Sequence, residues 1–214
     1  MNKSIRVRLI LALVLLALGA AQAVYAHYAP YFPADLWAAH LIQSVKSPAL
    51  LAAMVALSAA FTGWYAAALV AASAFFIGWA LGLLEALTVL LAGVLYFTST
   101  LLKIVVARPR PAADLVEIIV PPTGFSYPSG HTFFAVMLIG VLAFFVLRRA
   151  PRRAGILLAA VLFTLTLAVA FSRVYLGGHW ASDVVGSFFL AGSLLLFVTV
   201  AYDYLELRLR RKKQ

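Results

Sequence analysis

The sixty residues from Pro48 to Ala107 contain only two charged side chains, those of Glu85 and Lys103. A water-soluble domain carries roughly 25% charged residues, whereas this chain of 214 residues carries 11% and is 65% hydrophobic. Its mean hydropathy is +1.03. The apolar runs are continuous and do not alternate with polar residues, so they predict helices and exclude a β-barrel. We therefore expect an integral membrane protein, built as an all-α helical bundle.

The lengths of the apolar runs predict six membrane spans in a single domain covering residues 1–214, because a span needs about 20 residues. The predicted spans cover residues 7–26, 64–82, 84–106, 131–147, 154–171 and 179–202. The first also resembles a signal peptide, with "AQA" and "VYA" as possible cleavage sites. We expect an uncleaved helix there, because the six-span architecture requires it.

Three segments outside these spans are predicted to lie on one side of the membrane. Residues 27–47 read as an outer loop with an interfacial helix in "ADLWAAHLIQSV", and residues 49–61 as an outer-face or partly inserted helix. Residues 107–130 are rich in proline, which rules out a continuous helix. A long irregular segment held between rigid elements is typical of a functional loop, and we expect a catalytic loop between the third and fourth spans.

The net charge of +10 is concentrated in three short segments. Twelve of the seventeen basic residues lie just outside predicted spans: Lys3, Arg6, Arg8, Arg148, Arg149, Arg152, Arg153, Arg208, Arg210, Arg211, Lys212 and Lys213. This is the positive-inside pattern of cytoplasmic segments, and it argues against nucleic acid as a partner. It predicts a multi-pass protein of the inner (plasma) membrane with both termini in the cytoplasm and residues 27–62, 107–130 and 172–178 outside.

The five remaining basic residues are predicted to lie on the outer side, where the rule does not expect them. Apart from Lys46, all of them adjoin the outer ends of spans: Lys103, Arg108, Arg110 and Arg173. Three polar clusters contain most of them. The clusters are Lys103 with "RP" at Arg110 and Pro111, "PSGH" at Pro128 to His131, and "FSRVYLGGHWASD" at Phe171 to Asp183.

The third cluster holds the residue types that nucleophilic catalysis needs. His179 and Asp183 are four residues apart, so at the start of a helix both would project from one face. The carboxylate could accept the Nδ1 proton of the imidazole and leave Nε2 free to attack phosphorus. His131, which opens another helix, could then protonate the leaving oxygen.

The other polar residues of these clusters suit a phosphate. Arg110 and Arg173 offer planar forks for bidentate binding, and Lys103 offers a point charge. The backbone N–H groups at Ser129, Gly130 and His131 would open a helix and form an anion cradle. These cationic groups could do the work that a metal does elsewhere, so we expect neither a metal nor a cofactor. The absence of cysteine excludes disulfides and thiolate metal sites.

The three clusters, in this order and spacing over residues 103–183, resemble the signatures of the type 2 phosphatidic acid phosphatase superfamily. The resemblance implies a membrane lipid phosphatase in which His179 forms a phosphohistidine, Asp183 orients it and His131 is the general acid. Lys103, Arg110, Ser129, Gly130 and Arg173 would bind the phosphate. The substrate would be a lipid phosphate, and the predicted topology puts the site at the outer face. The small size and the short basic loops are typical of bacterial proteins, and they favour undecaprenyl pyrophosphate and phosphatidylglycerol phosphate over phosphatidate and lipid A phosphates.

Two other functions use the same residues. A lipid-to-lipid phosphotransferase would form the same phosphohistidine and exclude water from the second step. An anion-binding transporter would need the basic cluster but no oriented nucleophile. The patterns carry no information on the oligomeric state.

Several polar residues are predicted to lie outside the chemistry. Arg108 is interpreted as a snorkelling anchor at a span end, because the family spacing selects Arg110. His27 and His40 are expected to be unpartnered surface residues, and Glu85 to lie near the inner end of the third span, away from the site. Asp114 and Glu117 are expected on a solvated loop face.

Overall fold

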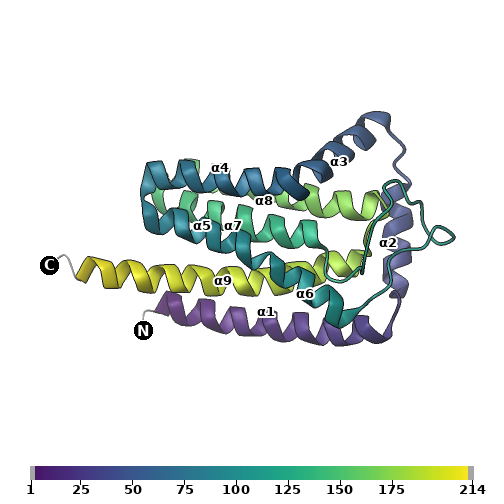
Figure 1. Ribbon diagram of the computed structural model, residues 1–214, viewed down its shortest axis with the longest axis horizontal. Coiled ribbons are helices and arrows are strands. Elements are labelled where there is room, and N and C mark those ends of the chain that lie inside the picture. The colour runs from purple at the N-terminus through teal and green to yellow at the C-terminus, as the bar shows by residue number, and fades with distance from the viewer. Residues whose placement is uncertain (1–2, 212–214) are drawn as a thin grey trace.

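The computed structural model describes residues 3–211, which form nine α-helices and no strand (Figure 1). The helices are α1 (Lys3–Tyr28), α2 (Pro33–Gln43), α3 (Pro48–Ala60), α4 (Gly63–Leu81), α5 (Leu83–Leu95), α6 (Phe97–Val106), α7 (Gly130–Arg149), α8 (Arg152–Tyr175) and α9 (Ala181–Arg211). Within this part of the chain six helical segments are long and apolar enough to cross a membrane, with α5 and α6 counted together. The predicted all-α, six-span architecture is confirmed.

The spans lie side by side, and the described ends of α1 and α9 nearest the two termini share one end of the bundle (Figure 1). At the opposite end, which we call the loop end, α2 runs across the bundle and the irregular segment 107–129 packs against it. The short helices α2 and α3 match the predicted interfacial and outer-face helices. All the irregular polar segments except the α7–α8 turn are therefore gathered at the loop end.

Three differences from the predicted helices affect the site. The third span is divided at Tyr96 into α5 and α6, although Tyr96 itself keeps right-handed helical dihedral angles (φ −53°, ψ −34°). Helix α8 continues to Tyr175, so Arg173 is a helical residue, and α9 begins only at Ala181, so His179 lies before it. Helix α6 ends at Val106. The next residue, Ala107, has a left-handed φ of 50° and precedes Arg108 and Pro109, so it turns the chain out of the helix.

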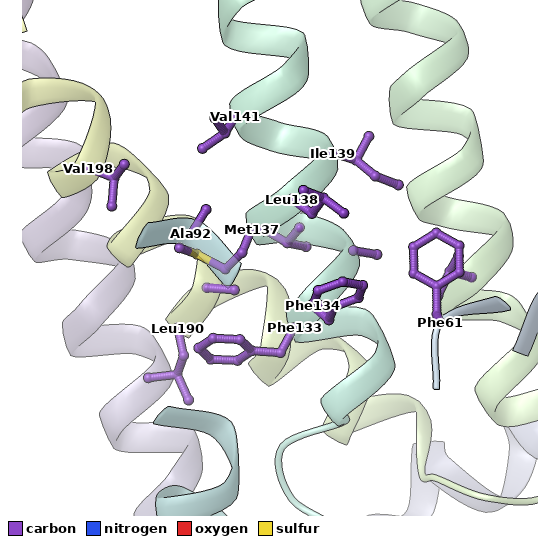
Figure 2. Close-up of a cluster of buried hydrophobic side chains, with 14 of the residues drawn as sticks. Phe61, Ala92, Phe133, Phe134, Met137, Leu138, Ile139, Val141, Leu190 and Val198 are labelled. Atoms are coloured by element: carbon purple, nitrogen blue, oxygen red, sulfur yellow. The ribbon is translucent and has the colours of Figure 1, made fainter. Parts of the chain in front are cut away.

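Helix α7 forms the centre of the bundle, packed on α5, α8 and α9. Every side chain from Phe133 to Ile139 is buried, and these residues make up much of the core in Figure 2. The peripheral spans instead expose large apolar side chains, such as Phe75, Phe76 and Trp79 on α4, to the surroundings. Because α7 is held on several sides, its first residues, which include "GH" of "PSGH", have a fixed place at the loop end.

The irregular segment is fastened to the bundle by a close contact between Tyr127 and Gly186 of α9. Tyr127 is fully buried, and its hydroxyl donates to the carbonyl oxygen of Gly19 at 3.1 Å. A Cβ atom on Gly186 would overlap the Tyr127 ring. Small residues at such contacts let membrane helices and their neighbours approach closely, so Gly186 sets the distance between α9 and the segment that carries Ser126 to Ser129.

We predict that Gly186→Ala lowers the thermal unfolding midpoint of the detergent-solubilised protein, because overpacking of a tight site costs about 1–3 kcal/mol. The matched control is Gly192→Ala on the same helix, where the new methyl group would meet Leu15 Cδ1 at an ordinary 3.4 Å. The measurement is thermal unfolding of both variants beside the unmodified chain. Equal midpoints for the two variants would contradict the packing described here.

Candidate active site

The residues of all three sequence clusters meet around the ring of His179 at the loop end. Burial lowers the pKa of His179 well below 6.5, and the charges of Lys103, Arg110 and Arg173 together with His131 lower it further. His179 and Arg173 are 3% and 5% exposed. The structure therefore brings the predicted nucleophile, the predicted acid and three predicted phosphate-binding cations into one neighbourhood.

A tight turn after α8, rather than a helix, positions His179. Gly177 adopts a left-handed φ of 72°, and a Cβ atom there would collide with the carbonyl of Glu117. The next two N–H groups, of Gly178 and His179, both donate to the carbonyl oxygen of Arg173 at 3.0 and 3.1 Å. The predicted placement of His179 on a helical face was wrong, because α9 starts two residues later.

His179 and Asp183 are nevertheless neighbours, with 3.6 Å between Nδ1 and Oδ2. This is an ion-pair distance and too long for a hydrogen bond, and Nδ1 has no hydrogen-bond partner among residues 3–211. The carboxylate of Asp183 instead accepts hydrogen bonds from the Ser126 hydroxyl, from the Trp180 N–H at 2.9 Å and from Arg108 at 2.6 Å. The expected hydrogen bond between His179 and Asp183 is not formed. The other partners of the carboxylate hold it close to the ring.

The other ring nitrogen of His179 defines its tautomer. Nε2 lies 3.2 Å from Nη1 of Arg110, and a guanidinium group can only donate. Nε2 must therefore offer its lone pair, and the proton of the neutral ring is on Nδ1, which faces Asp183. This is the tautomer that nucleophilic attack by Nε2 requires.

The backbone carbonyl groups of residues 123–126 form a short row to which two of the cations bind. Arg110 donates to residues 123 and 124 at 2.7 and 2.9 Å. Lys103 donates to residues 125 and 126 at 2.9 and 3.2 Å. Arg110 also donates to the carbonyl oxygen of Gly178. Both cations are thus held beside His179 by neutral oxygen acceptors, and these contacts neutralise none of their positive charge.

Ser58 and Thr62, near the α3–α4 junction, contact the last two residues of the site, which are Arg173 and His131. Arg173 donates from Nη1 to the Ser58 hydroxyl, and its buried Nε has no partner within the described chain. His131 Nε2 lies 2.6 Å from Thr62 Oγ1, and that hydroxyl donates to the Ser58 carbonyl at 2.9 Å. The hydroxyl has one proton, so it accepts from an Nε2–H of His131. No sequence motif pointed to Ser58 or Thr62.

The backbone N–H groups of residues 129–131, at the start of α7, differ in whether they are free to bind an anion. The Ser129 N–H points to the carbonyl oxygen of Asp183 at 3.4 Å, and the Ser129 hydroxyl accepts from Thr132 at 3.1 Å. Gly130 lies beside Lys103, since a Cβ atom there would be 3.9 Å from Lys103 Cε. N–H groups in the first turn of a helix have no acceptor within the helix. The N–H groups of Gly130 and His131 are therefore better placed for an anion than that of Ser129, which bridges α7 and α9.

The interpretation of Arg108 as a snorkelling anchor was wrong. Its side chain is fully buried and is paired with Asp183 and with Asp35 of α2, at 2.6 and 2.9 Å. A charged group can be buried at such a depth only when it is paired, and these two carboxylates come from distant parts of the sequence. His27 and His40 are exposed as expected, but each binds a backbone carbonyl oxygen, of Val106 and Leu115.

The other polar residues lie where they were expected. Glu85 is buried at the end of the bundle near the termini, where it accepts from Arg149 at 3.0 Å and from Tyr202 at 2.7 Å. Asp114 and Glu117 are exposed, and Glu117 pairs with Lys46. Among the basic residues used for the topology, Lys212 and Lys213 lie outside the described residues.

Comparison with known proteins identifies relatives of the chain. Residues 82–206 match the family model described as the PAP2 superfamily. Phosphatidylglycerophosphatase B of Bacillus subtilis is 34% identical over 131 residues, which are 59% of this chain and 61% of the relative. Undecaprenyl-diphosphatase of Sulfolobus acidocaldarius is 37% identical over 84 residues, 38% of this chain and 35% of the relative. The matches thus span less than two thirds of these relatives.

The fold also has a counterpart among solved structures. The crystal structure of a transmembrane PAP2-type phosphatidylglycerolphosphate phosphatase from Bacillus subtilis superposes with a TM-score of 0.77 at 22% sequence identity. The superposition covers 90% of this chain and 96% of that one. The likeness supports the helical arrangement across nearly the whole chain, including the helices before residue 82.

We predict that His179 is neutral at pH 6.5, with its proton on Nδ1. Its pKa is lowered, so the protonated form gains population only at a pH well below the usual value of about 6.5. Nitrogen NMR of ring-labelled histidine measures this directly, with His179→Gln identifying the resonance. A titration midpoint at or above pH 6.5, or a proton on Nε2, would overturn the assignment.

Proposed function

The chain belongs to the PAP2 superfamily, and from that membership we propose that it is an integral membrane phosphatase that hydrolyses a lipid phosphate through a phosphohistidine. The observation that carries the proposal is the neutral imidazole of His179, which presents a lone pair at Nε2 among three cations. A neutral nucleophile surrounded by positive charge is what attack on a phosphate anion needs.

In the first step Nε2 of His179 attacks phosphorus as the bond between phosphorus and the leaving oxygen breaks. Lys103, Arg110 and Arg173 bind the non-bridging oxygens, joined by the N–H groups at the start of α7. His131, which enters this step as the imidazolium, gives one proton to the leaving oxygen and becomes neutral. The positive charge that develops on the imidazole faces the carboxylate of Asp183, 3.6 Å from Nδ1.

In the second step water attacks the phosphohistidine and returns His179 to its neutral form. His131, now unprotonated, accepts the proton of the water, so that the histidine regains its starting state. The products are inorganic phosphate and the dephosphorylated lipid, which is a lipid alcohol from a phosphomonoester and a lipid monophosphate from a pyrophosphate. A lipid hydroxyl in place of water would make the protein a phosphotransferase.

Substrate binding also activates the nucleophile in this scheme. The lone pair of Nε2 is occupied by Arg110 at 3.2 Å. An anionic phosphate oxygen is a stronger acceptor for a guanidinium group than an imidazole nitrogen or a carbonyl group. Arg110 would therefore exchange these partners for phosphate oxygens, and the exchange frees Nε2 for attack.

The position of the site suits a lipid whose tail remains in the bilayer. Lys103, His131 and Arg173 all lie near the loop-end termini of spans α6, α7 and α8. A headgroup could reach His179 from the membrane surface while its acyl or prenyl chains stay in hydrocarbon. The positive-inside pattern supports an outer-face location for this site. We favour undecaprenyl pyrophosphate or phosphatidylglycerol phosphate, the two substrate classes suggested by the names of the relatives.

The test is phosphate release by the detergent-solubilised protein from a panel of lipid phosphates, assayed in EDTA because the proposed chemistry uses protein cations in place of a metal. His179→Ala should lower kcat at least about 10⁴-fold, since it removes the nucleophile. His40→Ala is the matched control, an exposed loop-end histidine bound only to a backbone carbonyl, and should keep full activity.

Each failure has a separate meaning. Turnover retained by His179→Ala would refute the nucleophile. Activity that appears only when a divalent ion is restored would refute the metal-free mechanism. Label transferred to an added lipid alcohol without release of phosphate would show a phosphotransferase, and binding without any turnover would favour the anion-binding alternative.

A further inference from the structure

Arg108 lies behind the proposed catalytic residues and connects two carboxylates. Its Nη1 donates to Asp183 Oδ1 at 2.6 Å and to the Ser182 hydroxyl at 2.8 Å, while Nη2 donates to Asp35 Oδ2 at 2.9 Å. The Phe32 ring covers the guanidinium group at 4.5 Å. With no solvent exposure and both ends of its fork bound, Arg108 has no freedom to swing toward a substrate.

Arg108, Asp183 and Asp35 form one charged unit, and Asp35 fixes its other side. Its Oδ1 accepts from the Ser182 N–H at 2.8 Å, and Oδ2 accepts from the Ser182 hydroxyl at 2.7 Å. Oδ2 also accepts from the Phe32 N–H at 2.9 Å, at the start of α2. The helix that crosses the loop end is thereby bonded to the residue immediately before Asp183. Asp35 lies outside residues 82–206, the region that matches the family model.

The charges of Arg108 and Asp35 determine the net charge beside the Asp183 carboxylate. Arg108 alone beside Asp183 would neutralise the carboxylate that faces His179. Asp35 supplies a second negative charge to the same guanidinium group, so the three side chains together carry one net negative charge. That charge lies on the Nδ1 side of His179, where the imidazole becomes positive as Nε2 bonds to phosphorus.

We propose that Arg108 and Asp35 are positioning residues for phosphoryl transfer, an inference that rests on the proposed function. Arg108 holds the Asp183 carboxylate at the Nδ1 side of His179. Asp35 shares the charge of Arg108 and anchors Ser182, so that Asp183 keeps the negative charge that stabilises the developing imidazolium. The interfacial helix α2 thus takes part in the reaction through a residue that touches neither His179 nor the substrate.

The test compares Asp35→Asn with Asp203→Asn, a matched carboxylate at the other end of the bundle. Asp203 is 8% exposed and also accepts from two arginines, Arg8 and Arg148. Asp35→Asn should lower kcat about tenfold or more and leave KM within about twofold, because Asp35 does not contact the substrate. Asp203→Asn should leave kcat unchanged even if its thermal midpoint falls by the same amount.

A second readout does not depend on turnover. The Nδ1–H resonance of His179 should shift in Asp35→Asn and remain unchanged in Asp203→Asn, because only the first variant alters the charge at Asp183. Wild-type protein without phosphatase activity would refute the proposed function alone, since this resonance would still report on the unit. If Asp35→Asn does not fold, Ser182→Ala removes the two hydrogen bonds of the hydroxyl, with Arg108 and with Asp35, without changing the charge and should lower kcat in the same sense.

The inference is overturned by an unchanged kcat and an unchanged His179 resonance in the folded Asp35 or Ser182 variant. It is also overturned if Asp35→Asn and Asp203→Asn lose activity equally and in proportion to their unfolded fraction. A rise in KM with constant kcat would likewise contradict it, because that pattern indicates a lost contact with the substrate.

Discussion

Arg108 carries a full positive charge at a position without solvent exposure, where the carboxylates of Asp183 and Asp35 meet it. Removing one partner from a buried pair of this kind costs about 3–5 kcal/mol, so the three side chains stay together or the region rearranges. They come from the irregular segment after α6, from the first turn of α9 and from α2. This pairing therefore fixes how the loop end closes over the bundle, and the site is built on it.

The geometry of the proposed active site follows from two kinds of support around that unit. Helix α7, buried on several sides, presents Gly130 and His131 at a fixed point. The turn at Gly177 and Gly178 presents His179 to the same point, while the row of carbonyl oxygens at residues 123–126 holds Lys103 and Arg110. The rigid start of α7 thus positions Gly130 and His131. The irregular segment, held in place by Tyr127 and Arg108, positions Lys103 and Arg110.

The sequence predicts most of this arrangement, for identifiable reasons. In hydrocarbon every backbone polar group must be satisfied within the segment, so long apolar runs can only be helices, and six spans follow. The three polar clusters stand out because ionisable groups near a membrane interior are usually functional.

Arg108 was misassigned because a basic residue at a span end looks the same whether it snorkels or is buried. Asp35, Ser58 and Thr62 could not be found, because their partners are distant in sequence and no spacing links them. The start of α9 was placed too early, since the turn residues before Ala181 look as compatible with a helix as those after it.

The central claim is that Nε2 of His179 becomes bonded to phosphorus, and the most direct measurement is to trap that bond. Protein mixed with a lipid carrying radiolabelled phosphate is quenched in alkali, where phosphohistidine survives, and the labelled peptide is identified by mass spectrometry. The chemistry described here predicts label on residue 179, stable in alkali and lost in acid. Turnover of the labelled lipid with the label on another residue, or with an acid-stable ester in place of the phosphoramidate, would contradict it.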